Sequence, residues 1–409
     1  MDLSDPPGSE PNPEKIDRSR LLLALLFVLA VIVAAFAFVQ QADLREAADA
    51  RATAESDAQV TADATERAQA PASPDDVVDQ PARNEPRRQL LTQLRTPMFE
   101  REGQILAASL SPDARRIATA GDDGTPRIWD VESGDLLAEL SGHADPVRVA
   151  HFSPDGSLLV TADDDGGMEL WDGVTFQNLA SVEVNISAVR AADFSPDGTS
   201  LLTAGDDGRV RIWRISVEAP GAATLSADLV LESRNDRITT AAFSPDGSRI
   251  VAAGNDGLAR IWDAHTGTAL ADLDGHDAQI NSAAFSPDGA RVATAGANGV
   301  VRIWDVSTAP PAEPFILNAH DGPVHKAAFY PDGLLLVTAG CDEQNIPCQT
   351  ASARAWDAET GELLTEWLID SPGVTSANLS PDGQHLLTIG ADGLVQLASI
   401  HLNTILEHE

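Results

Sequence analysis

Serine, histidine and aspartate are the side chains in this sequence that could carry nucleophilic or acid–base chemistry. The chain has nine His and 63 Asp and Glu, so its composition permits a Ser–His–Asp triad. Such a nucleophile typically stands in a G-x-S-x-G turn, and a zinc hydrolase typically carries H-E-x-x-H. Neither pattern occurs, and the phosphate-binding patterns G-x-G-x-x-G and G-x-x-x-x-G-K-[ST] are absent as well. The sequence therefore predicts no catalytic residue, no cofactor and a protein that is not an enzyme.

Two local clusters could bind a cation or form a bond. Asp163, Asp164 and Asp165 are consecutive carboxylates, but the spaced ligands and distant Glu of a calcium loop are missing, which favours a tight turn. Cys341 and Cys348 flank the segment CDEQNIPC, and such a pair could close a disulfide in an oxidising compartment. The alternative is two unrelated cysteines. A zinc site is disfavoured because no second pair is present, so we expect a disulfide and no metal.

The elements that must position these residues are written seven times along the chain. The tripeptide SPD, once YPD, begins at Ser111, Ser153, Ser195, Ser244, Ser286, Tyr330 and Ser380, in steps of 42, 42, 49, 42, 44 and 50 residues. A period in the forties predicts a repeat architecture. Within the copy 239–276, four apolar runs are separated by the turn sequences SPDG, NDG and HTG. Four short strands joined by hairpins form a small antiparallel sheet, and seven such sheets packed radially form a propeller.

The tripeptides that close the third run resemble the WD-repeat family, in a bacterial membrane-anchored form. They are IWD at Ile128, Ile261 and Ile303, LWD at Leu170 and AWD at Ala355, with GH at Gly142 and Gly275. The resemblance covers about Arg88 to the C-terminus. It implies an all-β, seven-bladed propeller of four-stranded antiparallel blades that binds protein or peptide partners. Fold alone does not fix function.

The same resemblance implies a hydrogen-bonded tetrad of His, Ser or Thr, Asp and Trp within a blade. Unit two carries all four as His143, Thr161, Asp165 and Trp171. Unit five has Asn298 in place of the Asp, and in unit six the cysteine-flanked insertion interrupts the turn. We expect these residues to be structural, because they satisfy buried polar groups.

The family also binds partners through residues just before the first strand and just before the turn Asp. In this chain, the resemblance assigns those positions to Arg148, Arg190, His325, Asp122, Asp164 and Asp206, with neutral residues at the equivalent places Thr239, Asn281, Thr375, Asn255, Ala297 and Ala391. A partner with mixed charge would suit this set, and a solvated rim is the alternative. His325 alone among the first-strand positions is expected to titrate near neutral pH, which gives little support to an enzyme with a central-channel site.

The N-terminal quarter predicts a membrane tether. Residues 1–20 read as a disordered tail, 40–70 as a helical stalk and 71–87 as a Pro-rich linker. Between them, residues 21–39 hold no charge, and at 1.5 Å per residue a helix of this length spans about 28 Å of a hydrocarbon core about 30 Å thick. We expect a transmembrane helix; a cleaved signal peptide, with Ala35 and Ala37 at its site, and a buried helix are the alternatives.

Orientation rests on weaker signals. Lys15, Arg18 and Arg20 precede the span and Arg45 and Arg51 follow it, which slightly favours a cytoplasmic N-terminus. With the cysteine pair, this places the propeller outside the cytoplasm, on a single-pass inner-membrane protein. A span, a helix and repeats in this order also resemble bacterial signalling ATPases that end in WD repeats. A sensor that works with a separate ATPase or kinase is therefore an alternative function.

Charge and ring closure complete the expectations. The formal net charge is −36 and Lys occurs only twice, which excludes a phosphate-backbone binder with clustered cations.

A propeller must close its ring because open sheet edges are a liability. Residues 89–94 repeat the fourth-strand pattern and are predicted to complete the last blade, with 403–409 as the alternative.

Overall fold

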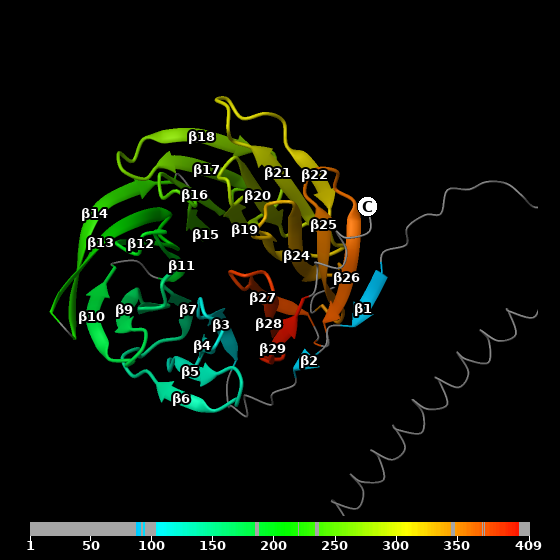
Figure 1. Ribbon diagram of the computed structural model, residues 1–409. Coiled ribbons are helices and arrows are strands. Elements are labelled where there is room, and N and C mark those ends of the chain that lie inside the picture. Colours follow the sequence, from blue (N-terminus) through cyan, green and yellow to red (C-terminus); the bar gives the residue numbers. More distant parts are fainter. Residues whose placement is uncertain are drawn as a thin grey trace, which may run out of the picture. The chain divides into compact units, whose positions relative to one another are not determined.

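Seven small sheets stand in a ring in the computed structural model of the protein (Figure 1). The structure describes residues 87–90, 93–94, 104–184, 188–219, 221–233, 237–344, 348–369, 371 and 373–400. All of these belong to one compact unit, residues 84–409. The predicted tail, span, stalk and most of the linker lie outside the described residues, as do residues 403–409. Among the described residues, no helix has the length and apolar character needed to cross a membrane.

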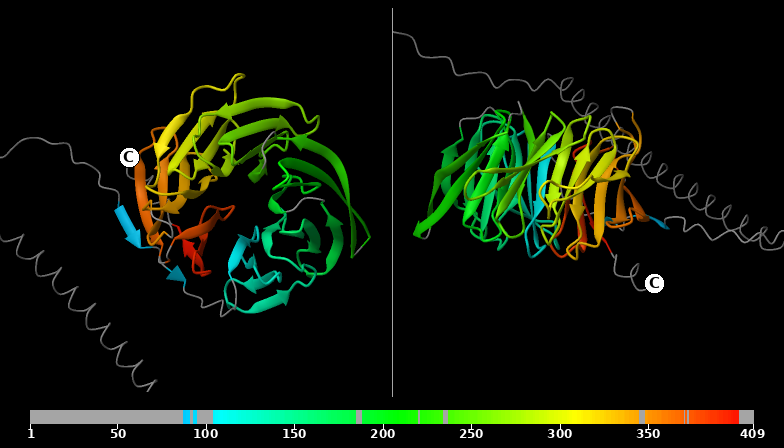
Figure 2. Two further views of the ribbon diagram at one scale, coloured as in Figure 1. Left: turned by 180° about the vertical axis from the view of Figure 1, so that it is seen from behind. Right: turned by 90° about the horizontal axis from the view of Figure 1, so that it is seen from above.

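Each blade is built from strands that follow one another along the chain. The first three blades comprise β3 (Ile105–Leu110), β4 (Arg116–Gly121), β5 (Arg127–Asp130) and β6 (Leu136–Glu139); β7 (Val147–Phe152), β8 (Leu158–Asp163), β9 (Gly167–Asp172) and β10 (Asn178–Glu183); β11 (Val189–Phe194), β12 (Ser200–Gly205), β13 (Arg209–Ala219) and β14 (Ala222–Glu232). Within a blade, each strand pairs antiparallel with the next. The first strand is the innermost in the ring (Figure 1), and two further views show the blades side by side around the centre (Figure 2).

The other four blades repeat this order. They comprise β15 (Ile238–Phe243), β16 (Arg249–Gly254), β17 (Leu258–Asp263) and β18 (Ala269–Asp274); β19 (Ile280–Phe285), β20 (Arg291–Gly296), β21 (Val300–Asp305) and β22 (Phe315–Asn318); β23 (Val324–Phe329), β24 (Leu335–Cys341), β25 (Ala351–Asp357) and β26 (Leu363–Ile369); and β27 (Val374–Leu379), β28 (His385–Gly390) and β29 (Val395–Ser399). The predicted all-β propeller of seven four-stranded blades is confirmed.

The SPD turns end the first strand for a chemical reason. In blade four, the Ser244 hydroxyl donates to Asp246 Oδ1 at 2.5 Å and accepts the Arg249 amide at 2.9 Å. The same carboxylate accepts the Ser248 amide and hydroxyl, and Gly247 supplies a φ of 70°. These bonds, that of Ser244 first, lower the pKa of Asp246 to about 2, so the turn keeps its charge at neutral pH. The turn therefore fixes where the second strand starts.

The core lies between blades rather than within them. The cluster that joins blades three and four packs Leu202 and Ile212 against Ile250 and Trp262, all of them buried. On the side of the SPD turns, an Arg from one blade stacks on a Phe of the next, with Arg249 5.2 Å from the ring centre of Phe285 and Arg291 5.1 Å from that of Phe329. Each blade thus buries the faces that its neighbours would otherwise expose.

Polar side chains of the innermost strands also join neighbouring blades. Asn378 Nδ2 donates to the Ala108 carbonyl at 2.7 Å, and Asn281 Nδ2 donates to the Val324 carbonyl at 3.0 Å. Thr239 Oγ1 donates to the Ile280 carbonyl at 2.5 Å. We call these side-chain-to-backbone bonds the inner braces. They satisfy the edge of one inner strand with a side chain from the strand beside it.

The N-terminal segment closes the ring, but not as one strand. β2 (Gln93–Leu94) pairs antiparallel with β29 and forms the fourth strand of blade seven. β1 (Arg87–Leu90) instead pairs parallel with β26, as a fifth strand on blade six. The prediction of an N-terminal closing strand is confirmed for Gln93–Leu94. It is wrong for residues 89–90, because the segment crosses from one blade to the next.

Candidate partner-binding face

Seven β-bulges create the predicted partner-binding positions. In every blade the pairing of the first two strands shifts by one residue near the start of the inner strand; in blade two the shift lies between Val147 and Val149, and in blade three between Val189 and Ala191. The extra residue is Arg148 in blade two, Arg190 in blade three and His325 in blade six. A bulge re-aims the side chain of its extra residue. The structure thereby gives a physical reason for the first-strand positions that the sequence singled out.

Backbone bonds hold each bulge beside the turn between the second and third strands. The Asp164 amide donates to the Pro146 carbonyl at 3.0 Å, and the Asp206 amide donates to the Ala188 carbonyl at 3.0 Å. The equivalent bonds occur in all seven blades. The extra residue of each bulge therefore lies close to the first residue of the turn. This brings the two predicted sets of positions together in each blade.

Arginine and aspartate alternate along this rim from blade two to blade four. Arg148 binds Asp164 through two nitrogens, with Nη2 2.7 Å from Oδ2, and Arg190 binds Asp206 at 2.9 and 2.8 Å. Arg190 also lies 3.9 Å from Asp164, so the two pairs are linked across blades. Arg237 Nε lies 2.9 Å from the same Asp206. We call Arg148, Asp164, Arg190, Asp206 and Arg237 the Arg–Asp ladder.

The ladder is half-buried and electrostatically satisfied. The hydrogen bonds that Arg190 donates to Asp206 raise the pKa of Arg190 and lower the pKa of Asp206. Both side chains keep partial contact with solvent, at 19% and 25% exposure. Arg237 was not predicted, because it stands one residue before its inner strand rather than at the bulge. Its signal in the sequence is its place directly before the apolar run ITTAAF.

The other predicted rim residues do not join the ladder. Asp122 is exposed, and within the described part of the chain it forms no ion pair. Burial, then the charge of nearby His320, lowers the pKa of His325 to about 4, so the expectation that it titrates near neutral pH is wrong. Thr239, Asn281 and Thr375 turn their side chains onto backbone carbonyls. The linked Arg and Asp side chains of this face therefore lie in blades two, three and four.

The tetrad of blade two forms with a different carboxylate from the one predicted. His143 Nε2 lies 2.7 Å from Thr161 Oγ1, and Trp171 Nε1 donates to the same hydroxyl at 2.8 Å. The partner of His143 Nδ1 is Asp163 Oδ2 at 2.7 Å, and Asp165 is exposed. The prediction that Asp165 completes this tetrad is therefore wrong. Asp163 ends β8, at a position where other blades have Gly, and its carboxylate reaches the imidazole of His143 directly.

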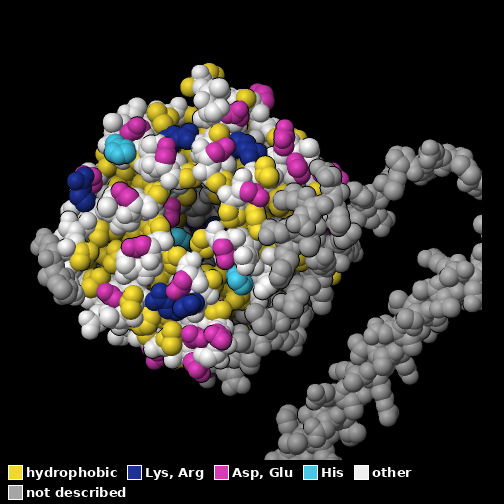
Figure 3. All heavy atoms as spheres, viewed as in Figure 1, with side chains coloured by type: hydrophobic (Ala, Val, Ile, Leu, Met, Phe, Trp, Pro, Cys, Tyr) yellow, Lys and Arg dark blue, Asp and Glu magenta, His cyan; other side chains and the backbone are white. Residues whose placement is uncertain are grey.

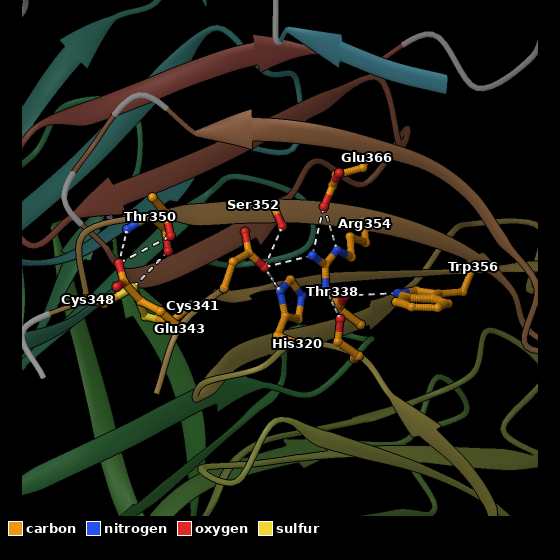
Figure 4. A network of polar contacts seen from close by, with 12 residues as sticks. His320, Thr338, Cys341, Glu343, Cys348, Thr350, Ser352, Arg354, Trp356 and Glu366 are labelled. Carbon is orange, nitrogen blue, oxygen red and sulfur yellow. Dashed lines mark hydrogen bonds and ion pairs between the residues drawn. A yellow bond between two sulfur atoms is a disulfide. The ribbon is translucent and has the colours of Figure 1, made fainter. Parts of the chain in front are cut away.

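Blades five and six vary the same arrangement. In blade five, Arg302 Nη1 donates to His276 Nδ1 at 3.1 Å where a carboxylate would stand, and burial with the Arg302 charge lowers the pKa of His276 to about 4. In blade six, the inserted loop supplies Asp342, whose Oδ1 lies 3.0 Å from His320 Nδ1 and 2.9 Å from Arg354 (Figure 4). The insertion that interrupts the turn in the sequence therefore restores the tetrad in the structure.

A disulfide anchors that loop. Cys341 and Cys348 are bonded, with their Cα atoms 6.0 Å apart. Glu343 within the loop accepts the Gln349 and Thr350 amides at 2.7 and 2.8 Å (Figure 4). Glu366 Oε1, on β26, lies 2.8 Å from Nη2 of Arg354, the arginine that also pairs with Asp342. The bonded cysteines thus hold the chain on either side of Asp342, and no group of metal-binding side chains occurs among the described residues.

A ring of seven four-stranded antiparallel blades, with Trp-to-Thr hydrogen bonds inside the blades, defines a propeller of the tryptophan–aspartate type. The family model WD domain, G-beta repeat matches six segments, residues 92–130, 134–172, 177–214, 228–263, 267–305 and 313–344, which cover more than half of the chain. The chain belongs to this family. The first match begins at β2 and ends with β5, in keeping with an N-terminal strand that completes the last blade. No curated protein matches the chain.

Proposed function

We propose that the protein is a membrane-tethered, non-catalytic platform that binds a protein or peptide partner on the Arg–Asp ladder. Propellers of this family are commonly protein-interaction scaffolds and are typically not enzymes. The observation that carries the proposal is the ladder itself, a row of charges that alternates in sign across three blades. Seven bulges of one geometry present the rim, and this arc of it carries Arg and Asp side chains that pair from one blade to the next.

The chemistry of the ladder suits a partner of mixed charge. Ion pairs that keep contact with solvent contribute about 0.2–1 kcal/mol each, so a partner can exchange them at small cost. An extended segment with interspersed acidic and basic side chains would present a complementary charge to each rung. Charges at a rim act chiefly on the rate of association, and dissolved salt screens them. The affinity for the partner should therefore fall as the salt concentration rises.

The tether and its side of the membrane belong to the same proposal. The uncharged run 21–39 supports a single span, and the bonded pair Cys341–Cys348 supports an oxidising compartment for the propeller. A membrane-impermeant maleimide should leave both cysteines unmodified on intact cells unless a reductant is added first. Labelling without reductant would contradict the disulfide, and no labelling even after reduction would contradict the proposed compartment.

The binding face is tested by capture from membranes. Photo-crosslinking and affinity capture of the full chain would be compared between the native protein and Arg148→Glu/Arg190→Glu. Reversal of both charges places four carboxylates along the rim, and we expect any partner of the ladder to be lost. A reversed partner peptide, with its own charges exchanged, should regain binding to the variant.

The matched control is Arg214→Glu. Arg214 pairs with Asp228 at 2.9 Å on the third and fourth strands of blade three, and both side chains are exposed. This reversal changes the net charge in the same direction but leaves the ladder intact, so capture should be unchanged. Equal capture by the native chain and by the double variant would sink the proposed face.

A further inference from the structure

The channel through the ring holds a second group of charges that the partner-binding face does not use. The innermost strands enclose a cavity of about 380 Å³, which is within the range of about 300–1,000 Å³ for small-molecule sites. Its walls include Lys326 from β23, Asp193 from β11 and His151 from β7. Figure 3 shows the hollow at the centre of the ring, with acidic and histidine side chains at its mouth. Lys326 and Lys15 are the only lysines in the sequence.

Arg148 and Arg190 also line the cavity, but they pair with Asp164 and Asp206. The other two full charges, Lys326 and Asp193, come from opposite walls. β11 belongs to blade three and β23 to blade six, so two blades separate them on one side and three on the other. Within the described residues, the Lys326 ammonium forms no hydrogen bond and no ion pair, although it interacts electrostatically with Asp193 and His151. The space between the lysine and the aspartate is therefore flanked by opposite charges that do not touch each other.

Three polar atoms beside this space are incompletely bonded. Asp193 Oδ2 accepts the Phe243 amide at 3.0 Å, whereas Oδ1 lies 3.9 Å from His151 Nδ1. His151 Nδ1 and Ser109 Oγ are buried atoms without a hydrogen-bond partner in the part of the chain that the structure describes. Ser109 is 4% exposed and lines an adjoining pocket that shares His151 and Asp193 with the channel. Buried polar atoms are normally bonded, so these atoms point to a molecule that would bond them.

The depth of the channel makes its charges costly when nothing binds them. His151 and Asp193 keep contact with the channel space, at 45% and 26% side-chain exposure. Burial raises the pKa of Asp193 and lowers the pKa of Lys326. A bound group of opposite charge would relieve each cost.

We propose that the channel binds a small zwitterion, whose carboxylate meets the Lys326 ammonium and whose ammonium meets Asp193 Oδ1. His151 Nδ1 would accept a hydrogen bond from the ammonium group. A simple anion would leave Asp193 unpaired and would be repelled by it, and a simple cation would be repelled by Lys326. The site therefore selects a molecule that carries both charges.

The experiment uses the small number of lysines. The full chain is treated with acetic anhydride, and acetylation of Lys326 and Lys15 is followed by peptide mass spectrometry. The probes are unbranched amino acids from glycine to 6-aminohexanoate, because the series samples the spacing between the charges. Pentanoate and pentylamine are the monofunctional controls. At least one zwitterion should slow acetylation of Lys326 by about tenfold or more, with Lys15 unaffected and both controls inactive.

Two variants separate binding from folding. Asp193→Asn keeps an oxygen that can accept the Phe243 amide but loses the charge, so its melting temperature should stay near that of the native chain while protection of Lys326 disappears. Lys326→Met removes the ammonium at similar length, and calorimetric heat with the best zwitterion should vanish. Protection by pentanoate equal to that by any zwitterion, or no protection by the whole series on the native chain, would overturn the proposal.

Discussion

The acid that completes the tetrad of blade two stands at the end of a strand rather than in the following turn. Asp163 Oδ1 also accepts the amides of Asp165 and Gly167, at 3.1 and 2.7 Å. A side chain at Gly167 would meet Asp163 Oδ2 at 2.8 Å. One carboxylate thus orients the histidine and shapes the turn, which explains why a residue other than glycine is accommodated at this strand end.

Substitution should distinguish the two carboxylates. Asp163→Asn removes the charged acceptor of His143 and weakens two amide bonds, so it should lower the free energy of unfolding by about 1–3 kcal/mol. Asp165→Asn changes an exposed side chain and should cost less than about 0.5 kcal/mol. Urea denaturation followed by tryptophan fluorescence measures both, since Trp171 belongs to the tetrad. Equal effects of the two substitutions would mean that Asp163 does not have this role.

His276 should make folding sensitive to acid. Its pKa falls from 6.5 in the unfolded chain to about 4 in the fold, so between these values the unfolded state binds a proton that the folded state does not. The free energy of unfolding should therefore fall as pH drops from 6.5 to 4, by on the order of 3 kcal/mol from this residue. His276→Gln should flatten this part of the pH profile measured by urea denaturation. A variant profile parallel to the native one would contradict the assignment.

Spacing predicts some of these side chains and not others. The distances along the chain from His143 to Thr161 and Trp171 place all three on adjoining strands, so the resemblance identified them correctly. Asp163 and Asp165 lie two residues apart, and only the direction of each carboxylate separates them. His151, Asp193 and Lys326 come from three blades, and no local pattern shows that their side chains line one channel.

At the scale of elements, turn chemistry is what made the strands predictable. In each SPD turn the Ser and Asp side chains accept hydrogen bonds from the amides that follow, so the tripeptide predicts where the first strand ends and the second begins. No SPD turn adjoins the short segments β1 and β2, so the sequence does not predict their ends. Their division between two blades depends on which sheet edges are open, and that is a property of the assembled ring.

The inserted loop of blade six depends on its disulfide. Cys341→Ser/Cys348→Ser should lower the free energy of unfolding by about 2 kcal/mol, because a short closed loop restricts the unfolded chain. It should also loosen Asp342, which bonds His320 and Ser352. Denaturation midpoints with and without dithiothreitol provide the check. Reductant should destabilise the native chain and leave the double variant unchanged; a native chain indifferent to reductant would contradict this role.

For the whole molecule, stability depends on how the ring is closed. Gln93 and Leu94 lie opposite Ala398 and Leu397, and in an antiparallel pair alternate residues donate their amides to the partner strand. Gln93→Pro/Leu94→Pro must therefore remove a ladder bond from blade seven. We expect a loss of about 1–3 kcal/mol and faster amide exchange in β27, β28 and β29 by mass spectrometry.

Arg88→Pro/Gln89→Pro in β1 is the matched control. β26 keeps its antiparallel partner β25 when β1 is lost, so blade six should retain its exchange protection. If the β1 variant lost more stability than the β2 variant, the parallel strand rather than the antiparallel one would be the element that closes the ring.

The inner braces hold neighbouring blades together around the channel. The bonds from Asn378, Asn281 and Thr239 all join innermost strands, whereas outer strands leave Leu137, Leu270 and other apolar side chains exposed. β13 and β14 already extend to 11 residues each at that perimeter. A reporter domain inserted at the tip of this hairpin should therefore leave the channel and the rim undisturbed, which offers a way to follow the protein without touching either surface.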